Sequence, residues 1–357
     1  MTQAGGNKPS QPRGRGYLLN FAASYSTGGY KRLTEYASWF DRNGGASFVI
    51  HPRCAHLATQ YQNIRFFIAR QSRFERLYND CAYLDEIEQQ IGQPELYYSY
   101  GIPLYSHFGR VSWFHLSNVL PLGARGVPAT LFERLKAAYL GTRIRAGLKY
   151  ADVISAESSS SLKLLAMPAS NKLFVSVNGS DDELARLQCP EETDRQDIAT
   201  VVGTAPYKAL GDTYRLFETL KRDNPALKLM IFGQPEYITA AFLAGKCDIV
   251  VRGLVPRAEV IECLRSSKFY LSTTRIENSY NAAAEGIFLA EESYISDIGP
   301  HRELLLNMPF DEVSVPGVPT RMLHLRRAQL TGANLRSWET VVEEMIARFR
   351  QALGPDP

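Results

Sequence analysis

Cysteine is scarce in this 357-residue chain, and the chain has no long apolar run. The five cysteines are odd in number and scattered, and no two of them form a C-x-x-C pair. This usage argues against a disulfide framework and a zinc site, and it predicts a reduced, cytoplasmic compartment. No run of 18 or more apolar residues occurs, so no membrane-spanning helix is predicted.

Several nucleotide-binding and metal-binding motifs are also missing. No G-x-G-x-x-G follows the first predicted strand and no P-loop lysine motif occurs, which argues against a dinucleotide site and against an NTPase. No D-x-D lies beside a predicted strand end. We therefore expect no metal site and no bound cofactor.

The composition is that of an ordinary globular protein, with 45% hydrophobic and 22% charged residues. The chain is long enough for two domains with separate hydrophobic cores. Residues 1–16 are polar and rich in Gly, Pro and Gln, and a disordered leader is expected there. Residues 1–186 hold 21 Lys and Arg against 14 Asp and Glu, whereas the remainder holds 19 against 23. The formal net charge of +3 hides this asymmetry. No nucleic-acid partner is expected.

Part of the basic charge of the first half lies in a helical pattern over residues 131–150, where basic residues are interleaved with apolar ones. Two interpretations are open. The helix could lie on an anionic membrane surface. Alternatively, it could pack on its own domain with a solvated basic face.

Short apolar runs alternate with helical patterns along the chain. The first group of predicted strands lies at 16–22, 46–51, 64–69, 96–100, 111–115, 152–156 and 173–177, and the second group at 198–202, 228–232, 248–251 and 269–272. Such alternation predicts parallel sheets with helices on both faces. We therefore expect an α/β fold with two doubly wound, Rossmann-like domains, 17–186 and 187–335, facing a central cleft, followed by an apolar C-terminal helix within 336–357.

The stretch after the last of these strands is the most informative. Asn278 and Ser279 are residue types common at helix N-caps, and they precede an alanine run, so a strand, a tight turn and a helix are predicted. The start of that helix would present the N–H groups of Ser279, Tyr280 and Asn281 to a phosphate.

Two carboxylates bracket the same turn. Glu277 lies just before the predicted helix and Glu285 about two turns inside it, so at ~1.5 Å per residue they stand about 10 Å apart. That is about the separation of the two sugar rings in a nucleotide-sugar, and carboxylates accept hydrogen bonds from sugar hydroxyls.

This Glu-x7-Glu pair at a strand-to-helix corner resembles the mark of the retaining glycosyltransferases of family 4, which have the glycosyltransferase B fold. Downstream, residues 295–303 look like the segment that follows the motif in that family. Upstream, residues 251–256 look like its nucleoside-binding turn and contain Arg252 and Leu254.

The resemblance implies roles for residues of the second domain. Glu277 would hold the donor sugar and Glu285 the ribose, and Lys208 resembles the lysine that contacts the donor pyrophosphate. Thr204 stands where the family has an arginine, so a second phosphate cation must come from elsewhere, with Arg252 and Arg275 as candidates. In addition, residues 278–280 read Asn-Ser-Tyr in place of Gly-Phe-Gly. The Tyr280 side chain does not fit the family's pattern, so we expect donor-sugar selectivity to differ from that of better-known members.

The resemblance also implies roles in the first domain. Gly28 and Gly29 resemble the family's glycine-rich first loop, although a plain strand-to-helix turn is an alternative. His115 closes a predicted strand where the family has a histidine that faces the donor sugar. A structural histidine is the alternative there, and His51 is a second candidate for the role. The C-terminal helix would pack back on the N-terminal domain.

The predicted protein is a retaining, metal-independent glycosyltransferase that uses a nucleotide-sugar donor and a glycan or lipid-linked glycan acceptor. The resemblance favours bacterial surface polysaccharide synthesis (O-antigen or capsule), in the cytoplasm or at the inner face of its membrane. Two alternatives are a catalytically inactive assembly subunit and a sugar-nucleotide epimerase or hydrolase on the same fold.

Overall fold

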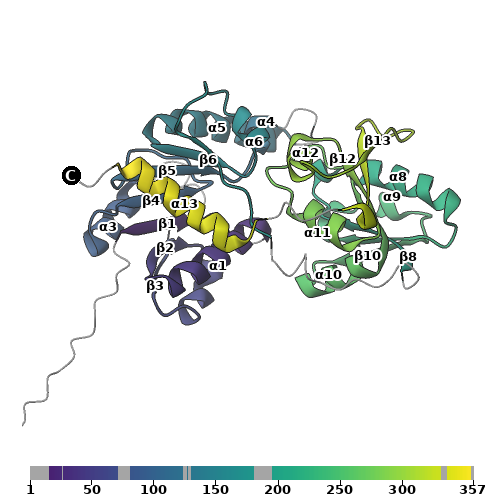
Figure 1. The fold of residues 1–357 in the computed structure, drawn as a ribbon, viewed down its shortest axis with the longest axis horizontal. Helices are drawn as coiled ribbons and strands as arrows, with labels where there is room; N and C mark the ends of the chain where they lie inside the picture. The colour runs from purple at the N-terminus through teal and green to yellow at the C-terminus, as the bar shows by residue number, and fades with distance from the viewer. Residues whose placement is uncertain are drawn as a thin grey trace, which may run out of the picture.

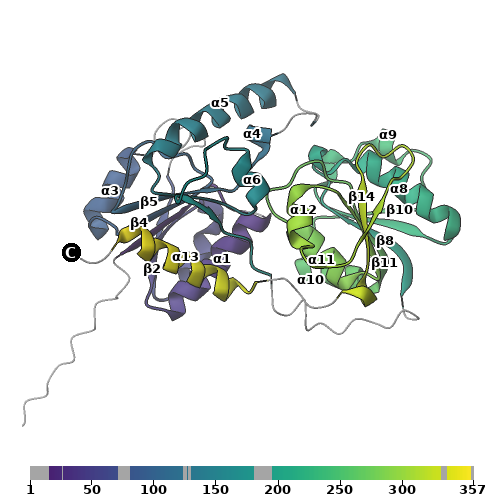
Figure 2. The same ribbon diagram turned by 45° about the horizontal axis from the view of Figure 1, so that its top comes forward.

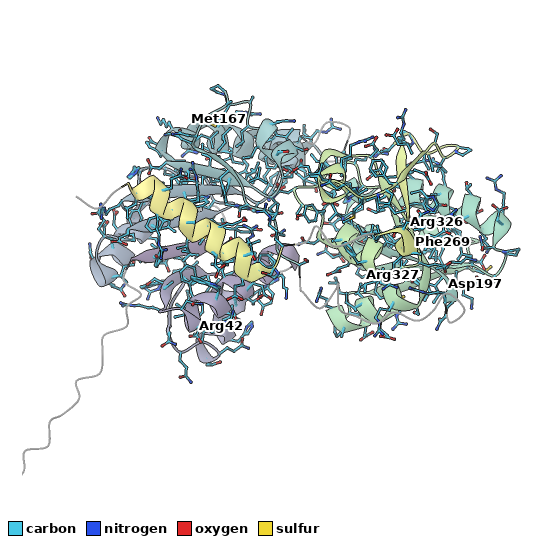
Figure 3. The ribbon with its side chains drawn as sticks, in the orientation of Figure 1. Arg42, Met167, Asp197, Phe269, Arg326 and Arg327 are labelled. Carbon is cyan, nitrogen blue, oxygen red and sulfur yellow. The ribbon has the colours of Figure 1, made fainter. Side chains whose placement is uncertain are left out.

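The computed structural model describes residues 16–25, 27–70, 81–123, 127, 130–180, 195–330 and 336–354. The expected leader lies outside these residues except for Gly16, and so does the predicted domain boundary at 186/187. Two α/β domains stand side by side (Figure 1). Arg42 at the end of the first helix and Phe269 in a strand of the second sheet mark the two domains in the side-chain view (Figure 3).

The first domain is built on a parallel sheet that has seven strands in the described chain, in the order β3-β2-β1-β4-β5-β6-β7. Their bounds are β1 Tyr17–Phe21, β2 Ala46–Ile50, β3 Ile64–Ile68, β4 Leu96–Tyr100, β5 Val111–Leu116, β6 Val153–Ala156 and β7 Leu173–Val175. The strand order reverses between β1 and β4.

The second sheet also has seven strands in the described chain, in the order β10-β9-β8-β11-β12-β14-β13. Their bounds are β8 Gln196–Val202, β9 Lys228–Phe232, β10 Ile249–Gly253, β11 Ser267–Ser272, β12 Glu292–Ser296, β13 Asp311–Val313 and β14 Met322–Arg326. Strand β14 is antiparallel to both of its neighbours. The four predicted strands, β8 to β11, pair in parallel as expected. The sheet has an antiparallel edge because a short connection rather than a helix joins β13 to β14.

Helices cover both sheets. In the first domain they are α1 Thr27–Arg42, α3 Cys81–Ile91, α4 Leu120–Gly123, α5 Leu131–Gly147 and α6 Ser159–Lys163, with the 3-10 helices Pro52–Thr59 and Leu148–Tyr150. In the second domain they are α8 Leu210–Asp223, α9 Ala240–Leu243, α10 Arg257–Ser266, α11 Asn281–Leu289 and α12 Gly299–Leu304, with the 3-10 helices Pro206–Lys208, Pro235–Tyr237 and Arg327–Gln329. The chain then ends with α13 Trp338–Leu353.

Helix α13 returns to the first domain, where it crosses the sheet (Figures 1 and 2). Its buried residues are Trp338, Val341, Val342, Met345, Ile346 and Phe349. They share one apolar cluster with side chains of β1, β2, β4 and α1. The spacing of these residues makes one apolar stripe, and burial of that stripe fixes the helix on the sheet.

Helix α5 packs on its domain with only its second half. Gly141, Ile144 and Gly147 are buried, whereas the first half leaves four large apolar side chains exposed: Leu131 (74%), Phe132 (70%), Leu135 (62%) and Tyr139 (42%). Figure 2 shows α5 along the outside of the first domain. No helix in the described part of the chain is both long and apolar enough to span a bilayer.

Candidate active site

In open parallel sheets, ligands bind at the carboxyl ends of the strands, where the strand order reverses. In the second sheet this point lies between β8 and β11. The loops after these two strands touch: the Arg275 N–H donates to the Tyr207 carbonyl at 2.8 Å. The Thr273 hydroxyl donates to the Ala209 carbonyl at 3.1 Å. Two loops that are distant in the sequence therefore form one surface.

An ion pair between Lys208 and Glu277 lies on this surface. Lys208 Nζ donates to Glu277 Oε1 at 2.5 Å, and the two side chains are only 14% and 18% exposed. Burial alone would lower the pKa of Lys208, but the Glu277 carboxylate outweighs burial and raises that pKa above its ordinary value. A protonated lysine and a carboxylate, both identified from the sequence, are thus brought into contact.

Backbone geometry holds Lys208 in position. The residue ends the 3-10 helix Pro206–Lys208, and Ala209 after it has a left-handed backbone with a φ of 51°. Gly203 has a φ of 99°, and a Cβ at that position would lie 2.9 Å from Lys208 Cε. A left-handed alanine costs about 1 kcal/mol, and strain of this kind is common where a side chain has to be aimed.

Helix α11 begins later than the sequence predicts. Its N-cap is Tyr280, whose side chain makes no capping hydrogen bond. The first N–H groups of the helix belong to Asn281 and the two alanines after it. The predicted N-cap roles of Asn278 and Ser279 are therefore wrong, although a helix end does follow the Glu277 loop.

The side chains of this loop bind the first domain instead of capping the helix. Asn278 is buried, and its Nδ2 donates to the Leu116 carbonyl at the end of β5, at 2.9 Å. Asn178 Nδ2 donates to the Ser279 hydroxyl at 2.9 Å, and the Ser161 hydroxyl donates to the Asn278 carbonyl at 3.3 Å. The loop that carries Glu277 therefore joins the two domains.

A pocket lies beside α11, between the domains. It is lined by Lys31, residues 178–180, Arg257, Tyr280, Asn281, Ala284, Glu285 and Trp338. The Glu285 carboxylate, 16% exposed, accepts from Arg257 Nη2 at 2.8 Å and from Nε at 2.9 Å. Each glutamate of the motif thus forms an ion pair with a basic side chain. Sequence reasoning missed Lys31 and Arg257, because no local pattern marks either residue.

The glycine pair of the first domain reaches the start of α11. Gly28 and Gly29 lie in the first turn of α1. A Cβ at Gly28 would lie 3.4 Å from Asn281 Nδ2, and one at Gly29 would lie 3.0 Å from Ser24 Oγ. The absence of side chains lets the first turns of α1 and α11 approach each other, so the predicted loop and the predicted helix end are brought together.

His115 is placed differently from the other predicted residues, because its side chain has no exposed area. Its Nδ1 lies 2.8 Å from the Ser155 hydroxyl, its Nε2 lies 3.7 Å from Glu157 Oε1, and its ring stacks on Tyr100. Burial, together with the Arg32 guanidinium, lowers the pKa of His115 to about 4. The histidine is therefore neutral at pH 7 and buried, and its contact with a donor sugar stays a prediction.

The remaining predicted residues lie on the second domain. Leu254, in the turn after β10, is 71% exposed. Arg252 Nη2 lies 3.3 Å from the Glu259 carboxylate, and Arg275 Nη2 lies 3.1 Å from that of Asp212. Neither arginine lines the pocket beside α11.

The site combines a helix end, several cations and two carboxylates. A helix end and cations stabilise phosphate charge, whereas carboxylates accept sugar hydroxyls. Among the described residues, no three His, Cys, Asp or Glu side chains form a group that could hold a metal ion.

No protein-family model and no curated protein matches the chain. Similar solved structures exist. WaaG, a glycosyltransferase involved in lipopolysaccharide biosynthesis, has a TM-score of 0.61 and 10% identity, over 94% of this chain and 91% of that chain. HepE from Anabaena, solved in complex with UDP-glucose, has a TM-score of 0.55 and 14% identity, over 94% and 92%.

A third similar structure is AviGT4, a glycosyltransferase involved in avilamycin A biosynthesis, with a TM-score of 0.55 and 11% identity over 94% of this chain and 97% of that chain. At these identities the likeness concerns the fold. The two domains have the glycosyltransferase B fold, as the sequence predicts.

Proposed function

We propose that the protein is a retaining glycosyltransferase that moves a sugar from a nucleoside-diphosphate donor to a hydroxyl group of a glycan or lipid-linked glycan. The observation that carries the proposal is the Lys208–Glu277 ion pair beside the start of α11, at the point where the strand order of the second sheet reverses. Two similar structures support the donor class, since HepE was solved with UDP-glucose and an E. coli trehalose-6-phosphate protein with UDP-2-fluoro glucose.

In the proposed reaction, the acceptor hydroxyl oxygen bonds to the anomeric carbon as the bond from that carbon to the phosphate oxygen breaks. Front-face attack retains the anomeric configuration, and the departing phosphate oxygen takes the hydroxyl proton. Lys208 and the N–H groups of α11 stabilise the negative charge that develops on the phosphate. Glu277 holds hydroxyls of the sugar as it gains positive charge, and Glu285 holds the ribose.

We further propose that transfer needs no metal, because Lys208 and the helix end already supply positive charge at the phosphate. Transfer should therefore survive EDTA. A loss of activity in EDTA that Mg²⁺ or Mn²⁺ restores would contradict this part of the proposal.

Surface polysaccharide synthesis is the proposed setting, at the inner face of the cytoplasmic membrane. The exposed apolar side chains of α5 support it, because they lie on a helix that also carries Arg134, Lys136 and Arg145. An apolar patch with basic neighbours suits a membrane that contains anionic lipid. WaaG, which resembles this chain in fold, acts in lipopolysaccharide biosynthesis.

The test is an assay of UDP- and GDP-sugars with and without lipid-linked acceptors, measuring release of nucleoside diphosphate and of free sugar. Lys208→Met should lower turnover by about 10²-fold or more, as is typical when one group that stabilises a developing oxyanion is removed. Lys268→Met is the matched control, because Lys268 lies at the other end of β11 and pairs with Asp197. Release of free sugar together with nucleoside diphosphate, without acceptor, would indicate a hydrolase, and release of neither product under any condition would indicate an inactive assembly subunit.

A further inference from the structure

The pocket beside α11 has a charge pattern that the glutamate motif does not explain. Lys31 comes from α1 of the first domain and Arg257 from the start of α10 in the second. Both also line a pocket that contains Asn281, the first residue of α11. Cations from two domains thus converge on a helix end that already favours an anion.

Trp338 is one of the residues that line the pocket. Trp338 is 6% exposed, and among the described residues its Nε1 has no hydrogen-bond partner. The indole is held firmly: the Arg32 guanidinium lies 5.8 Å from its ring, and a Cβ on Gly179 would lie 2.6 Å from it. A buried N–H without a partner costs about 1–3 kcal/mol, so a ligand that accepts from it gains affinity.

Both cations of the pocket form ion pairs with nearby carboxylates. Lys31 pairs with Glu35 one turn along α1, at 2.6 Å, and keeps 36% of its side chain exposed. Arg257 pairs with Glu285. Both cations therefore have flexible side chains at the edge of the pocket, where they can turn toward an anion without leaving a carboxylate fully buried.

The loop after β8 supplies one cation for a phosphate, Lys208. Thr204 in the same loop carries no charge, and its hydroxyl donates to the Gln234 carbonyl at 2.7 Å. A second cation for the phosphate must therefore come from another element. Arg252 and Arg275 do not line the pocket, whereas Lys31 and Arg257 do.

We propose that Lys31 and Arg257 bind the diphosphate of the donor nucleotide, with Trp338 Nε1 donating to one of its oxygens and Glu285 accepting from the ribose. This proposal rests on the proposed function. Because Lys31 belongs to the first domain and Arg257 to the second, the nucleotide would draw the two domains together. Donor binding would then stabilise the closed arrangement of the cleft.

The experiment is calorimetric titration of the full chain with UDP, GDP, inorganic pyrophosphate and uridine. Lys31→Gln and Arg257→Gln should each weaken nucleoside diphosphate binding about tenfold and abolish binding of pyrophosphate, and Trp338→Phe should weaken the diphosphate several-fold. Matched controls are Lys149→Gln, an exposed lysine of the first domain, and Arg265→Gln at the far end of α10.

Glu285→Gln separates the two parts of the pocket, since it should weaken uridine binding without weakening pyrophosphate binding, because it releases Arg257 from its carboxylate partner. If the wild type binds UDP or GDP and the Lys31 and Arg257 variants bind as tightly, the diphosphate subsite is overturned while the proposed function stands. If the wild type binds no nucleoside diphosphate at all, the proposed function is overturned and the subsite with it.

Discussion

Glu277 and Glu285 each form an ion pair with a basic side chain, yet their substitution should affect the reaction differently. Glu277 contacts Lys208, which places its carboxylate beside the developing charge in the proposed reaction, whereas Glu285 lies about one turn inside α11 beside Arg257. Glu277→Ala should mainly lower kcat, by about 10²-fold, because its contacts strengthen as the sugar becomes cationic. Glu285→Ala should mainly raise KM, about tenfold.

Steady-state kinetics with a nucleotide-sugar donor would measure both variants. Glu262→Ala, on the exposed face of α10, is the control and should change neither constant. Full kcat in Glu277→Ala would show that its assigned role is wrong.

The two glutamates and Lys208 could be singled out from the sequence because the segments that carry them, strand ends followed by a turn or a helix, resemble segments of the family 4 glycosyltransferases. Lys31, Arg257 and Trp338 could not. Their relevance depends on where α1, α10 and α13 meet, and one sequence without partners does not contain that information. The burial of His115 could not be predicted either, because the residues beside it, Arg32 and Glu157, come from distant parts of the chain.

His115 should make the protein sensitive to acid. In the folded state its pKa is about 4, through burial and the nearby Arg32, with Glu157 and Tyr100 beside it. In the unfolded state its pKa is about 6.5. The unfolded state therefore binds the proton first, so the free energy of unfolding should fall as the pH decreases from about 6.5 to about 4, by about 3 kcal/mol from this group.

Urea unfolding between pH 7 and pH 4 measures this effect. His115→Phe keeps a ring against Tyr100 and should show a shallower loss of stability over the same range. His301, also buried and with a pKa of about 4, remains in that variant and supplies the residual slope. An unchanged slope in His115→Phe would contradict the assignment.

The start of helix α6 donates hydrogen bonds to a residue of the other domain. The Glu303 carboxylate of α12 accepts from the N–H groups of Ser159 and Ser160, at 2.8 and 2.9 Å, and from the Ser160 hydroxyl at 2.6 Å. Burial would raise the pKa of Glu303, but these donors outweigh it and lower that pKa, so the group is a carboxylate at pH 7. A charged acceptor from α12 thus holds α6 across the domain interface.

Glu303→Ala should therefore loosen the domain interface without unfolding either domain. We expect a larger radius of gyration in small-angle scattering and a higher KM for the donor, with little change in the unfolding midpoint. Glu312→Ala is the control, because Glu312 pairs with Arg302 and Arg321 inside the second domain. Equal compactness in wild type and Glu303→Ala would contradict this role.

Most strands were predictable because they are short apolar runs, and each of the eleven predicted strands overlaps an observed one. Strands β12, β13 and β14 were missed. Segment β13 has three residues, two of them exposed, so it carries no apolar run, and β14 follows it without a helix between them. The start of α11 was misplaced for another reason: Asn278 and Ser279 form hydrogen bonds with the first domain, and this tertiary contact overrides their local capping tendency.

Helix α5 should bind membranes through its exposed first half. A double variant, Phe132→Ser with Leu135→Ser, removes much of the apolar patch and leaves the capping box of Thr130 and Glu133 intact. Cosedimentation should show the wild type on phosphatidylcholine vesicles that contain phosphatidylglycerol, and much less on phosphatidylcholine alone. The double variant should stay in the supernatant, whereas Leu306→Ser, an exposed leucine of the second domain, should behave as the wild type. Equal binding by the double variant would contradict the assignment.

The two domains are connected twice, and both connections are anchored at the same place. Ser180 and Ser337 form a parallel bridge just before α13. Arg32, fully buried, donates to the carbonyls of Ser176 and Val177 and to Asn178 Oδ1. Because Asn178 also binds Ser279, the anchor is linked to the loop of Glu277. Asn178, Ser180 and Trp338, which follows Ser337, also line the pocket, so the anchor and the pocket share residues.

Removal of α13 should test how far the whole molecule depends on this arrangement. Its six buried side chains are worth roughly 1.5–3 kcal/mol each, a total comparable with the 5–15 kcal/mol that stabilises a typical protein. Truncation after residue 332 removes no residue of the Glu277–Lys208 site, yet it uncovers one face of the first sheet and removes Trp338 from the pocket. We expect aggregation or a fall of the unfolding midpoint, with loss of transfer. Met345→Ala provides a graded step, since it should cost about 2–5 kcal/mol and leave the site intact. A soluble truncated protein with full transfer activity would contradict the dependence of the site on α13.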